Sequence, residues 1–342
     1  IHIKIAIENF YMDGICTLGN DQVYEQIVAL LNSIEEIYGQ EMPVCIYPYD
    51  DNTAKIAAEI AHRPNVQLYD NQVSIEQWDE FVRNIWDAHP TAQKLWQQIS
   101  TDKYYRVGTH RRFCAFDGPF DRFVYMDADT LLMSPLDSIF SQLNENDWVV
   151  YDFQFRDLSH VYNPASAKLA ELFTAEELHN EIFCSGFYGS KKSLFPAERR
   201  DWLLDKLRQG EAEVLYHMAP DQTILNYMVM RSGISNYNFA HQLPESEITG
   251  CCVTSSHFET RNNILYDRGN RLTYIHYIGV SSRFFNQLCA GENIDFPYRE
   301  LFLHYRYLHE PEKRPKFTTK PKAYNAKPSL AKRVFKKLGL AV

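Results

Sequence analysis

The sequence predicts a single α/β domain in which a mostly parallel central sheet is flanked by helices. Short apolar segments alternate with amphipathic helical segments along the first part of the chain, which is the order that parallel sheets require. The 342 residues are 45% hydrophobic and 23% charged, a globular composition that excludes disordered, collagen-like and disulfide-scaffold proteins. No internal repeat or low-complexity linker interrupts residues 1–312, so we expect one domain there.

The first unit runs from a strand in GICTLG through a polar turn at residues 19–21 into an amphipathic helix, with Val28, Leu31 and Ile34 on one face. PVCIYPY and NVQLYD predict the second and third strands, and residues 74–116 predict mainly helix. FVYM is an apolar strand that leads directly into Asp-Ala-Asp, and WVVYDF and FCSGFYGS predict two further strands. Ligands of open α/β sheets bind beyond the carboxyl ends of the strands, so we expect the site there.

The number of cysteines and the distribution of charge indicate in which cellular compartment the protein lies and which kinds of partner it can bind. The seven cysteines are an odd number without CxxC spacing, which favours a reducing compartment over disulfide, zinc or redox chemistry. No apolar run approaches the ~20 residues of a spanning helix, and the first residues lack a secretory signal, so we expect a cytoplasmic protein. Residues 313–342 carry a charge of +10, so the remainder sums to −19, which is the wrong sign for a nucleic-acid binder.

We expect residues 313–342 to be a basic tail outside the domain. Leu330, Val334 and Leu338 recur at helical spacing among lysines and arginines, a pattern typical of helices that lie on anionic membrane surfaces. Peripheral contact with the inner face of a membrane would make a lipid-linked substrate plausible. The alternative is a disordered solubilising terminus, because isolated helices of this length are marginal in water.

Asp127 and Asp129 flank Ala128 at the end of the FVYM strand. In an extended conformation both carboxylates project to the same side, where they repel each other unless a cation lies between them. Mn²⁺ or Mg²⁺ suits such oxygen ligands. One alternative is a strand-end turn with solvated carboxylates. Another is the phosphatase motif DxDx[TV] with Asp127 as nucleophile, but Leu131 stands where that motif has Thr or Val.

Four segments, spread over residues 15–284, together resemble the retaining glycosyltransferases of family 8, the group that includes glycogenin and bacterial lipopolysaccharide galactosyltransferases. They are CTLGNDQVYEQIVALLNSI, FDRFVYMDADTLL, APDQTILNYMV and YIHYIGVSSRF. The resemblance implies the GT-A fold and a metal-dependent, retaining transfer of a hexose from a nucleotide-diphosphate sugar, such as a UDP-sugar. The acceptor would be a hydroxyl of a saccharide, a lipid-linked glycan or a small molecule, as in cell-envelope glycan synthesis. The alternative is a catalytically weak relic that binds nucleotide sugars.

The same resemblance implies roles for individual residues. Leu18, Asn20 and Tyr24 would contact the base and ribose, although Tyr24 could equally be a core aromatic. His276 would join Asp127 and Asp129 as the third metal ligand, although a lone His on an apolar strand is usually a core residue. Further donor contacts would come from Asp127, Ala128, Gly279 and an arginine of THRRFCAF, namely Arg112, with Arg111 and Arg106 as alternatives.

Asp221 and Gln222 would lie beside the transferred sugar, with Asp221 holding hydroxyls and Gln222 facing the anomeric carbon. Asp221 could instead only cap a helix, and both roles could coexist. Three positions depart from the family pattern. Ser282 stands in place of the diphosphate lysine, Arg283 begins the pair that replaces Pro-Trp, and Cys184 replaces an Asn. We expect Ser282 and Arg283 to contribute to donor binding. Either Arg283 supplies the missing positive charge, or the donor is bound more weakly.

Overall fold

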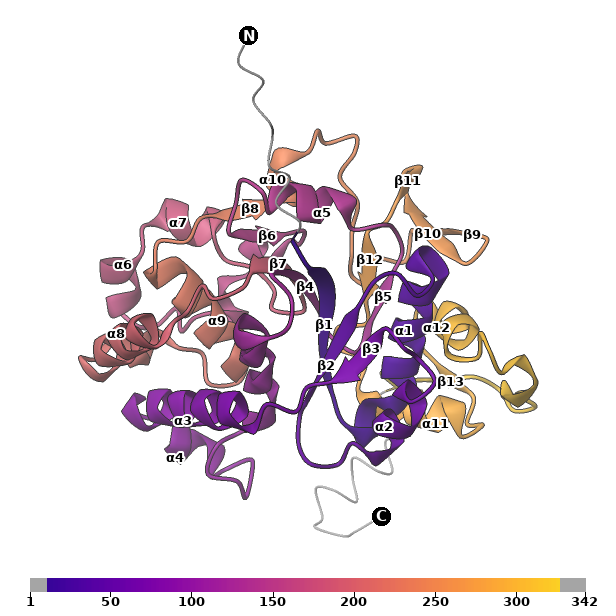
Figure 1. Cartoon of the computed structure of the whole chain (residues 1–342), viewed down its shortest axis with the longest axis horizontal. Helices are drawn as coiled ribbons and strands as arrows, with labels where there is room; N and C mark the ends of the chain where they lie inside the picture. Colours follow the sequence, from indigo (N-terminus) through magenta and orange to yellow (C-terminus); the bar gives the residue numbers. More distant parts are fainter. Residues whose placement is uncertain (1–10, 327–342) are drawn as a thin grey trace.

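The computed structural model describes residues 11–326 of the chain. Its centre is a seven-stranded sheet in the order β3-β2-β1-β4-β7-β6-β8, and every neighbouring pair is parallel except the two that involve β7. Helices cover both faces of this sheet (Figure 1). The predicted α/β architecture with a mostly parallel sheet is therefore confirmed. The strands are β1 (Asp13–Gly19), β2 (Val44–Pro48), β3 (Val66–Leu68), β4 (Arg122–Met126), β6 (Trp148–Val150), β7 (Phe187–Lys191) and β8 (Asn236–Asn238).

The central strands are buried on both faces, which explains their nearly continuous apolar sequences. In β4, Phe123 and Tyr125 belong to one core cluster, whereas Val124 and Met126 belong to the cluster on the opposite face. One cluster packs the sheet against a group of helices that includes α3 (Gln72–Ala88), α8 (Ala197–Arg208), α9 (Pro220–Arg231) and the long 3-10 segment η2 (Val107–Asp117). The other packs it against α1 (Tyr24–Tyr38) and α5 (Asp137–Gln142).

The first unit forms as the sequence predicts. After β1 comes a single 3-10 turn, η1 (Asp21–Val23), and then α1, whose Val28, Leu31 and Ile34 are all buried. The helical prediction for residues 74–116 corresponds to α3, α4 (Ala92–Trp96) and η2. The remaining helices are α2 (Ala54–Ile60), α6 (Lys168–Leu172), α7 (Ala175–Asn180), α10 (Phe239–Gln242), α11 (Ser282–Cys289), α12 (Arg299–Arg306) and the 3-10 turns η3 (Gln154–Arg156), η4 (Leu158–His160), η5 (Glu211–Val214) and η6 (Pro311–Lys313).

Two local predictions need correction. The strand expected in FCSGFYGS begins only at Phe187, and the residues before it form a loop whose backbone reaches the site. The Asp-Ala-Asp sequence is not extended: β4 ends at Met126, and the Thr130 amide donates to the Asp127 carbonyl (3.0 Å) across a tight turn. This turn leads into β5 (Thr130–Leu132), so the two carboxylates are brought together by the turn and not by strand periodicity.

β5 pairs antiparallel with β12 (Tyr274–His276), and the register places His276 opposite Thr130. This pairing brings a distant part of the sequence to the Asp-Ala-Asp turn. β5 is also tied to α1, because the Leu132 amide donates to the buried Ser33 hydroxyl (3.0 Å). A third core cluster then packs β5 and β12 against α11 and α12.

Two small sheets complete the chain. One contains β9 (Glu259–Arg261), β10 (Ile264–Asp267) and β11 (Asn270–Arg271); in the other, β13 (Ile294–Asp295) pairs with β14 (Lys322–Ala323). Residues 313–326 therefore run along the body, and Phe317 and Tyr324 pack against the third core cluster. Leu330, Val334 and Leu338 of the predicted amphipathic helix lie outside the described residues.

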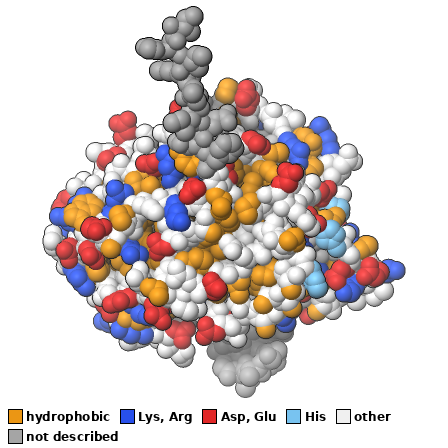
Figure 2. Space-filling view, viewed as in Figure 1, with side chains coloured by type: hydrophobic (Ala, Val, Ile, Leu, Met, Phe, Trp, Pro, Cys, Tyr) orange, Lys and Arg blue, Asp and Glu red, His pale blue; other side chains and the backbone are white. Residues whose placement is uncertain are grey.

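The surface in Figure 2 has interspersed acidic and basic side chains, without a continuous basic patch on the described part of the visible face. None of the helices within residues 11–326 has the length and apolar character that crossing a membrane requires. All seven cysteines are free thiols.

Candidate active site

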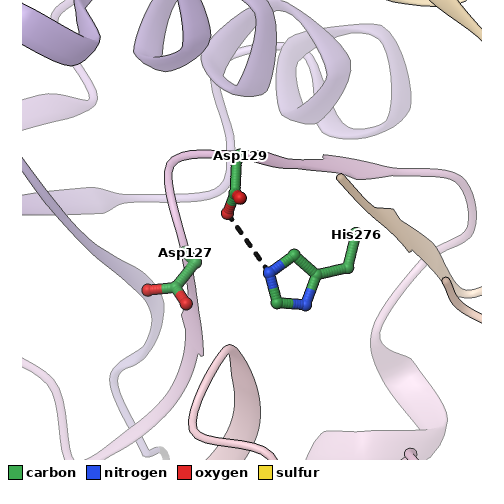
Figure 3. Close-up of side chains that lie close together, drawn as sticks. All are labelled: Asp127, Asp129 and His276. Carbon is green, nitrogen blue, oxygen red and sulfur yellow. Dashed lines mark ion pairs between the residues drawn. The ribbon is translucent and has the colours of Figure 1, made fainter. Parts of the chain in front are cut away.

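Asp127, Asp129 and His276 converge at the edge of the sheet where β4 ends (Figure 3). One ligand atom from each side chain lies within 4.8 Å of the others, and His276 Nε2 is 3.2 Å from Asp129 Oδ1. The imidazole is buried, but it faces the acidic pair and not the hydrocarbon core. The structure thus brings together all three predicted metal ligands, and this group could hold a metal ion.

A glycine makes room for this cluster. A Cβ atom on Gly186 would lie 2.4 Å from His276 Cε1 and 3.0 Å from Asp127 Oδ2, so any side chain would displace a ligand. The Gly186 carbonyl also accepts a hydrogen bond from the Asp127 amide (2.9 Å). Sequence reasoning missed Gly186, because a close approach of this kind depends on segments that are distant along the chain.

Arg112 lies directly behind the cluster and is buried. Its guanidinium donates to Asp127 Oδ1 (3.0 Å) and pairs with Asp221 Oδ2 (3.1 Å). It also donates to the carbonyls of Thr109 (3.0 Å) and Ser185 (2.8 Å). These contacts together use all three nitrogens of the planar fork, which fixes the two carboxylates relative to one another. Of the three arginines that the sequence offered, Arg112 is the one bound to the acidic turn, whereas Arg111 pairs with Asp79.

The charges of Asp127, Asp129 and His276 shift one another's pKa values. Burial raises the pKa of Asp127, and the charge of Asp129 adds to the rise, whereas Arg112 and His276 act against it. The pKa of Asp129 is lowered: burial acts in the opposite direction, but the charge and hydrogen bond of His276 outweigh it. The pKa of His276 is raised well above its ordinary value, because its interactions with Asp129 outweigh the effect of burial. A divalent ion bound here would compete with protonation of His276, so metal affinity is expected to rise with pH.

A cavity of about 610 Å³ opens beside the acidic turn, and we call it the donor cavity. Its position beyond the carboxyl ends of β1 and β4 is the one that the alternating sequence predicted. It contains eight of the predicted site residues, namely Leu18, Asn20, Arg112, Asp127, Ala128, Asp129, Gly279 and Ser282. Its remaining lining residues are Gly19, Gln22, Val23, Gln26, Tyr49, Arg106, Thr109, Val280 and Ser281. Gly279 has φ +83°, a conformation that side chains disfavour.

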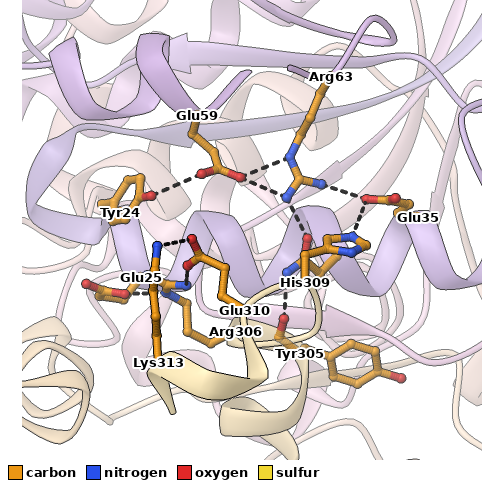
Figure 4. A network of polar contacts seen from close by, with 11 residues as sticks. Tyr24, Glu25, Glu35, Glu59, Arg63, Tyr305, Arg306, His309, Glu310 and Lys313 are labelled. Carbon is orange, nitrogen blue, oxygen red and sulfur yellow. Dashed lines mark hydrogen bonds and ion pairs between the residues drawn. The ribbon is translucent and has the colours of Figure 1, made fainter. Parts of the chain in front are cut away.

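Tyr24 and Arg283 are not among the residues that line this cavity. Tyr24 donates to Glu59 (3.0 Å), within a polar network that connects α1 with α2 and α12 (Figure 4). Burial, the Glu59 charge and this hydrogen bond raise the pKa of Tyr24 to about 12. The Arg283 guanidinium lies over the ring of Phe284, 4.5 Å from its centroid.

Asp221 and Gln222 lie at the start of α9 and are not among the residues that line the donor cavity. The same Arg112 nitrogen that contacts Asp127 is 3.1 Å from Asp221. The Ser185 hydroxyl donates to Asp221 (3.3 Å), and the Ser185 amide donates to Gln222 Oε1 (3.2 Å). The Gln222 amide group donates in turn to the His160 carbonyl (2.9 Å). The pKa of Asp221 is lowered: burial opposes this, and the charges of Arg112, His110 and Arg106 outweigh it. The loop before β7 thus connects both residues to the acidic turn.

A second, smaller cavity of about 170 Å³ has His276 and Cys184 among its lining residues. Asp152, just after β6, also lines it and accepts from the backbone amides of Gln154 (2.7 Å) and Cys184 (3.2 Å). Burial raises the pKa of this carboxyl to about 7. Sequence reasoning did not select Asp152, although an aspartate directly after a buried strand is the same signal that identified Asp127.

This fold is the GT-A fold of solved glycosyltransferases. The structure is similar to that of the bifunctional glycosyltransferase WbbM, with a TM-score of 0.52 and 16% identity over 89% of this chain. It is also similar to the galactosyltransferase LgtC, solved with donor and acceptor sugar analogues, with a TM-score of 0.51 and 16% identity over 85% of this chain. The match spans 52% of the WbbM chain and 100% of the LgtC chain.

Comparison by sequence gives no relatives. No protein-family model matches the chain, and no curated protein matches it either. The structural likeness shows the fold, and the chemistry has to be argued from the residues of the site.

Proposed function

We propose that the chain is a metal-dependent glycosyltransferase that moves a hexose from a UDP-sugar to an acceptor hydroxyl with retention of anomeric configuration. The observation that carries the proposal is the convergence of Asp127, Asp129 and His276 beside the donor cavity. Three candidate ligands from two distant segments meet at the carboxyl edge of a GT-A sheet, where open α/β folds bind their ligands.

The donor set fits a hard divalent cation. Two carboxylates and one imidazole suit Mn²⁺ or Mg²⁺, and the absence of a Cβ at residue 186 leaves space between them. When bound, such an ion neutralises the charge that develops on the departing nucleotide diphosphate, so that no side chain has to protonate it. Arg112 holds Asp127 in its ligating position and keeps the turn rigid.

The nucleotide sugar binds in the donor cavity. Leu18 and Asn20 contact the base and ribose from the end of β1. Asn20 is preorganised, because it donates to Asp50 (2.8 Å) and accepts from the Gln22 amide (3.1 Å). Asp127 and Ala128 bound the diphosphate on one side, and Gly279 and Ser282 bound it on the other.

The transferred sugar lies towards Asp221 and Gln222. Asp221 orients its hydroxyl groups, and Gln222, held by Ser185 and the His160 carbonyl, stabilises the positive charge at the anomeric carbon. His276 lines the cavity with Asp152 and Cys184, and it pairs with Asp129, which lines the donor cavity; we assign the smaller cavity to the acceptor. The acceptor hydroxyl then attacks from the face that the diphosphate leaves. A saccharide, a lipid-linked glycan or a small molecule would serve as acceptor.

A panel of nucleotide sugars tests the proposal, with Mn²⁺ or Mg²⁺ and with EDTA as the metal-free comparison. We expect one UDP-sugar to be turned over only with metal, and NMR of the product to show the anomeric configuration of the donor. Asp129→Asn should weaken Mn²⁺ binding by at least about 100-fold, since even partners outside the ligand set are worth 10- to 100-fold. Asp147→Asn is the matched control, because it makes the same change at an exposed aspartate paired with Lys191.

Each contrary result has a distinct meaning. If the chain binds UDP-sugars with metal but neither hydrolyses nor transfers them, it is a binding protein and the proposed enzymatic activity is wrong. An inverted product would reject the same-face attack. Turnover that is unaffected by EDTA and by Asp129→Asn would reject the metal centre.

A further inference from the structure

The donor cavity is lined by two arginines in different electrostatic situations. Arg112 is buried, and its charge is shared by the carboxylates of Asp127 and Asp221. Arg106 is exposed and forms no ion pair with any residue in the described part of the chain. Arg106 therefore has a guanidinium that is free to bind an anion in the cavity.

The backbone at Arg106 is held in an unusual conformation. Its φ of 52° and ψ of 36° lie in the left-handed region, which costs a non-glycine residue roughly 1–2 kcal/mol. Both the amide and the hydroxyl of Thr109 donate to its carbonyl (3.0 and 2.7 Å). Gly108 approaches the Tyr49 carbonyl so closely that a Cβ there would lie 2.3 Å from the oxygen. The start of η2 is thus fixed with Arg106 at the cavity.

The charges of the site show which ligand group Arg106 fits. With one divalent ion bound, the three aspartates (Asp127, Asp129 and Asp221) would balance the charges of that ion and of Arg112. Arg106 is then the uncompensated charge among the lining residues, whereas a nucleoside diphosphate brings more than one negative charge. The lining also includes Gly279 to Ser282, which lead into the first turn of α11, where the N-cap Ser281 makes no side-chain capping bond. Helix amides of this kind favour the same anion.

We propose that Arg106 binds the diphosphate of the donor, an assignment that rests on the proposed function. Arg283, the other cation expected to serve this purpose, lies over Phe284 and outside the lining of the cavity. A guanidinium suits the role because its fork donates to two phosphate oxygens at once.

The chain provides a closely matched pair of variants. Arg106→Gly removes the guanidinium and retains the left-handed backbone, since glycine adopts it without strain. Arg268→Gly makes the same change at an exposed arginine with φ 50°, in the turn between β10 and β11 and outside the lining of the cavity. Unlike Arg106, Arg268 pairs with Asp267 (3.5 Å) and donates to the Ile248 carbonyl (2.7 Å), so the stability of this variant is measured alongside its binding. Arg106→Lys keeps the charge and loses the fork. The probes are UDP, inorganic pyrophosphate and uridine, each titrated calorimetrically with Mn²⁺ present.

We expect Arg106→Gly to raise the Kd of UDP and of pyrophosphate about 10- to 100-fold, the range of one or two charge-assisted hydrogen bonds. Uridine binding should change by less than about twofold, because it has no phosphate. Arg268→Gly should leave all three constants unchanged, and Arg106→Lys should recover part of the loss. The effect of Arg106→Gly should shrink as salt is raised.

The outcomes separate this inference from the proposed function. If the wild-type protein binds UDP and Arg106→Gly binds it equally well, the diphosphate role of Arg106 is wrong and the donor site stands. If Arg283→Ala loses UDP binding and Arg106→Gly does not, Arg283 and not Arg106 binds the diphosphate. If the wild-type protein binds neither UDP nor pyrophosphate with Mn²⁺, the donor site itself is rejected together with the role of Arg106.

Discussion

At the scale of single residues, Gly186 is the position where the smallest change should have the largest effect on the site. In Gly186→Ala the added methyl would lie 2.4 Å from the His276 ring, so the ring has to move away from the aspartates. We expect Mn²⁺ affinity to fall by at least about tenfold, the lower end of what misplacing a ligand costs. Isothermal titration with Mn²⁺ measures this.

The control for Gly186→Ala is Gly39→Ala, at the end of α1. Gly39 has φ +60°, and a Cβ added there would have no neighbouring atom within 4 Å, so this variant carries backbone strain without a clash. It should lose more than about 1 kcal/mol of stability and keep its metal affinity. Equal metal affinity in both alanine variants would show that His276 does not need the space at Gly186.

The raised pKa of Asp152 predicts how the stability of the fold depends on pH. Its pKa is about 7 in the folded protein against an ordinary value of 3.8, because burial disfavours its charge. The stability that it contributes is fully present below pH 3.8 and is lost as the pH rises towards 7, since the folded state holds the proton longer. Relative to Asp152→Asn, the wild-type protein should lose up to about 1.4 kcal/mol of unfolding free energy per pH unit in this window.

Urea unfolding at a series of pH values between 4.5 and 8 measures this difference. The slope against pH is the decisive quantity, because the amide also alters the hydrogen bonds from Gln154 and Cys184 and so shifts the whole curve. Parallel curves for the two proteins would mean that the carboxylate is already ionised at pH 4.5.

At the scale of elements, the link between α1 and β5 depends on one hydroxyl. Ser33 donates to the Leu30 carbonyl (2.7 Å) and accepts from the Leu132 amide (3.0 Å), and it is fully buried. Ser33→Ala leaves that amide without a partner, which should cost about 1–3 kcal/mol in urea unfolding. Metal affinity should fall as well, because β5 positions β12 and His276.

Ser232→Ala, at the end of α9, is the comparison for Ser33→Ala. Its hydroxyl has a buried oxygen without a hydrogen-bond partner among the described residues, so its removal should leave stability unchanged or slightly raised. If the two serine variants are equally stable, the contact between Ser33 and Leu132 contributes nothing to the fold.

The elements also show what a single sequence can and cannot predict. β4 was predictable because a strand buried on both faces is a continuous apolar run. α1 was predictable because a helix buried on one face has apolar residues at helical spacing. The pairing of β5 with β12 leaves no such pattern, since it joins segments far apart in the chain. His276 was found only because its neighbours resemble a known motif. Gly186 matters through a close approach of segments that are distant in the chain, which leaves no local pattern. Arg106 was one of three candidate arginines and Asp152 follows a buried strand as Asp127 does, but the sequence alone does not rank such candidates.

At the scale of the whole molecule, the body continues beyond the expected boundary at residue 312. Deleting residues 313–342 removes β14, Phe317 and Tyr324 from their contacts with β13 and the third core cluster. Phe317 and Tyr324 are only half-buried, so losing their contacts should cost about 1–3 kcal/mol in total, less than full burial of two aromatic side chains. This truncation should therefore lower the melting temperature by a few degrees.

Deleting only residues 327–342 removes none of these contacts and is the matched truncation. We expect its melting temperature to equal that of the full chain in differential scanning calorimetry. Equal melting temperatures for both truncations would show that residues 313–326 add no stability to the body.

The pairing of β5 with β12 also has a consequence for biosynthesis. About 150 residues separate the acidic turn from His276. This long segment of chain has to fold back and bring its two ends together before a cation can contact all three ligands. A nascent chain from which His276 has not yet emerged would therefore present only two of the three ligands. Capture of the ion would then mark the moment when the last third of the polypeptide has reached its place.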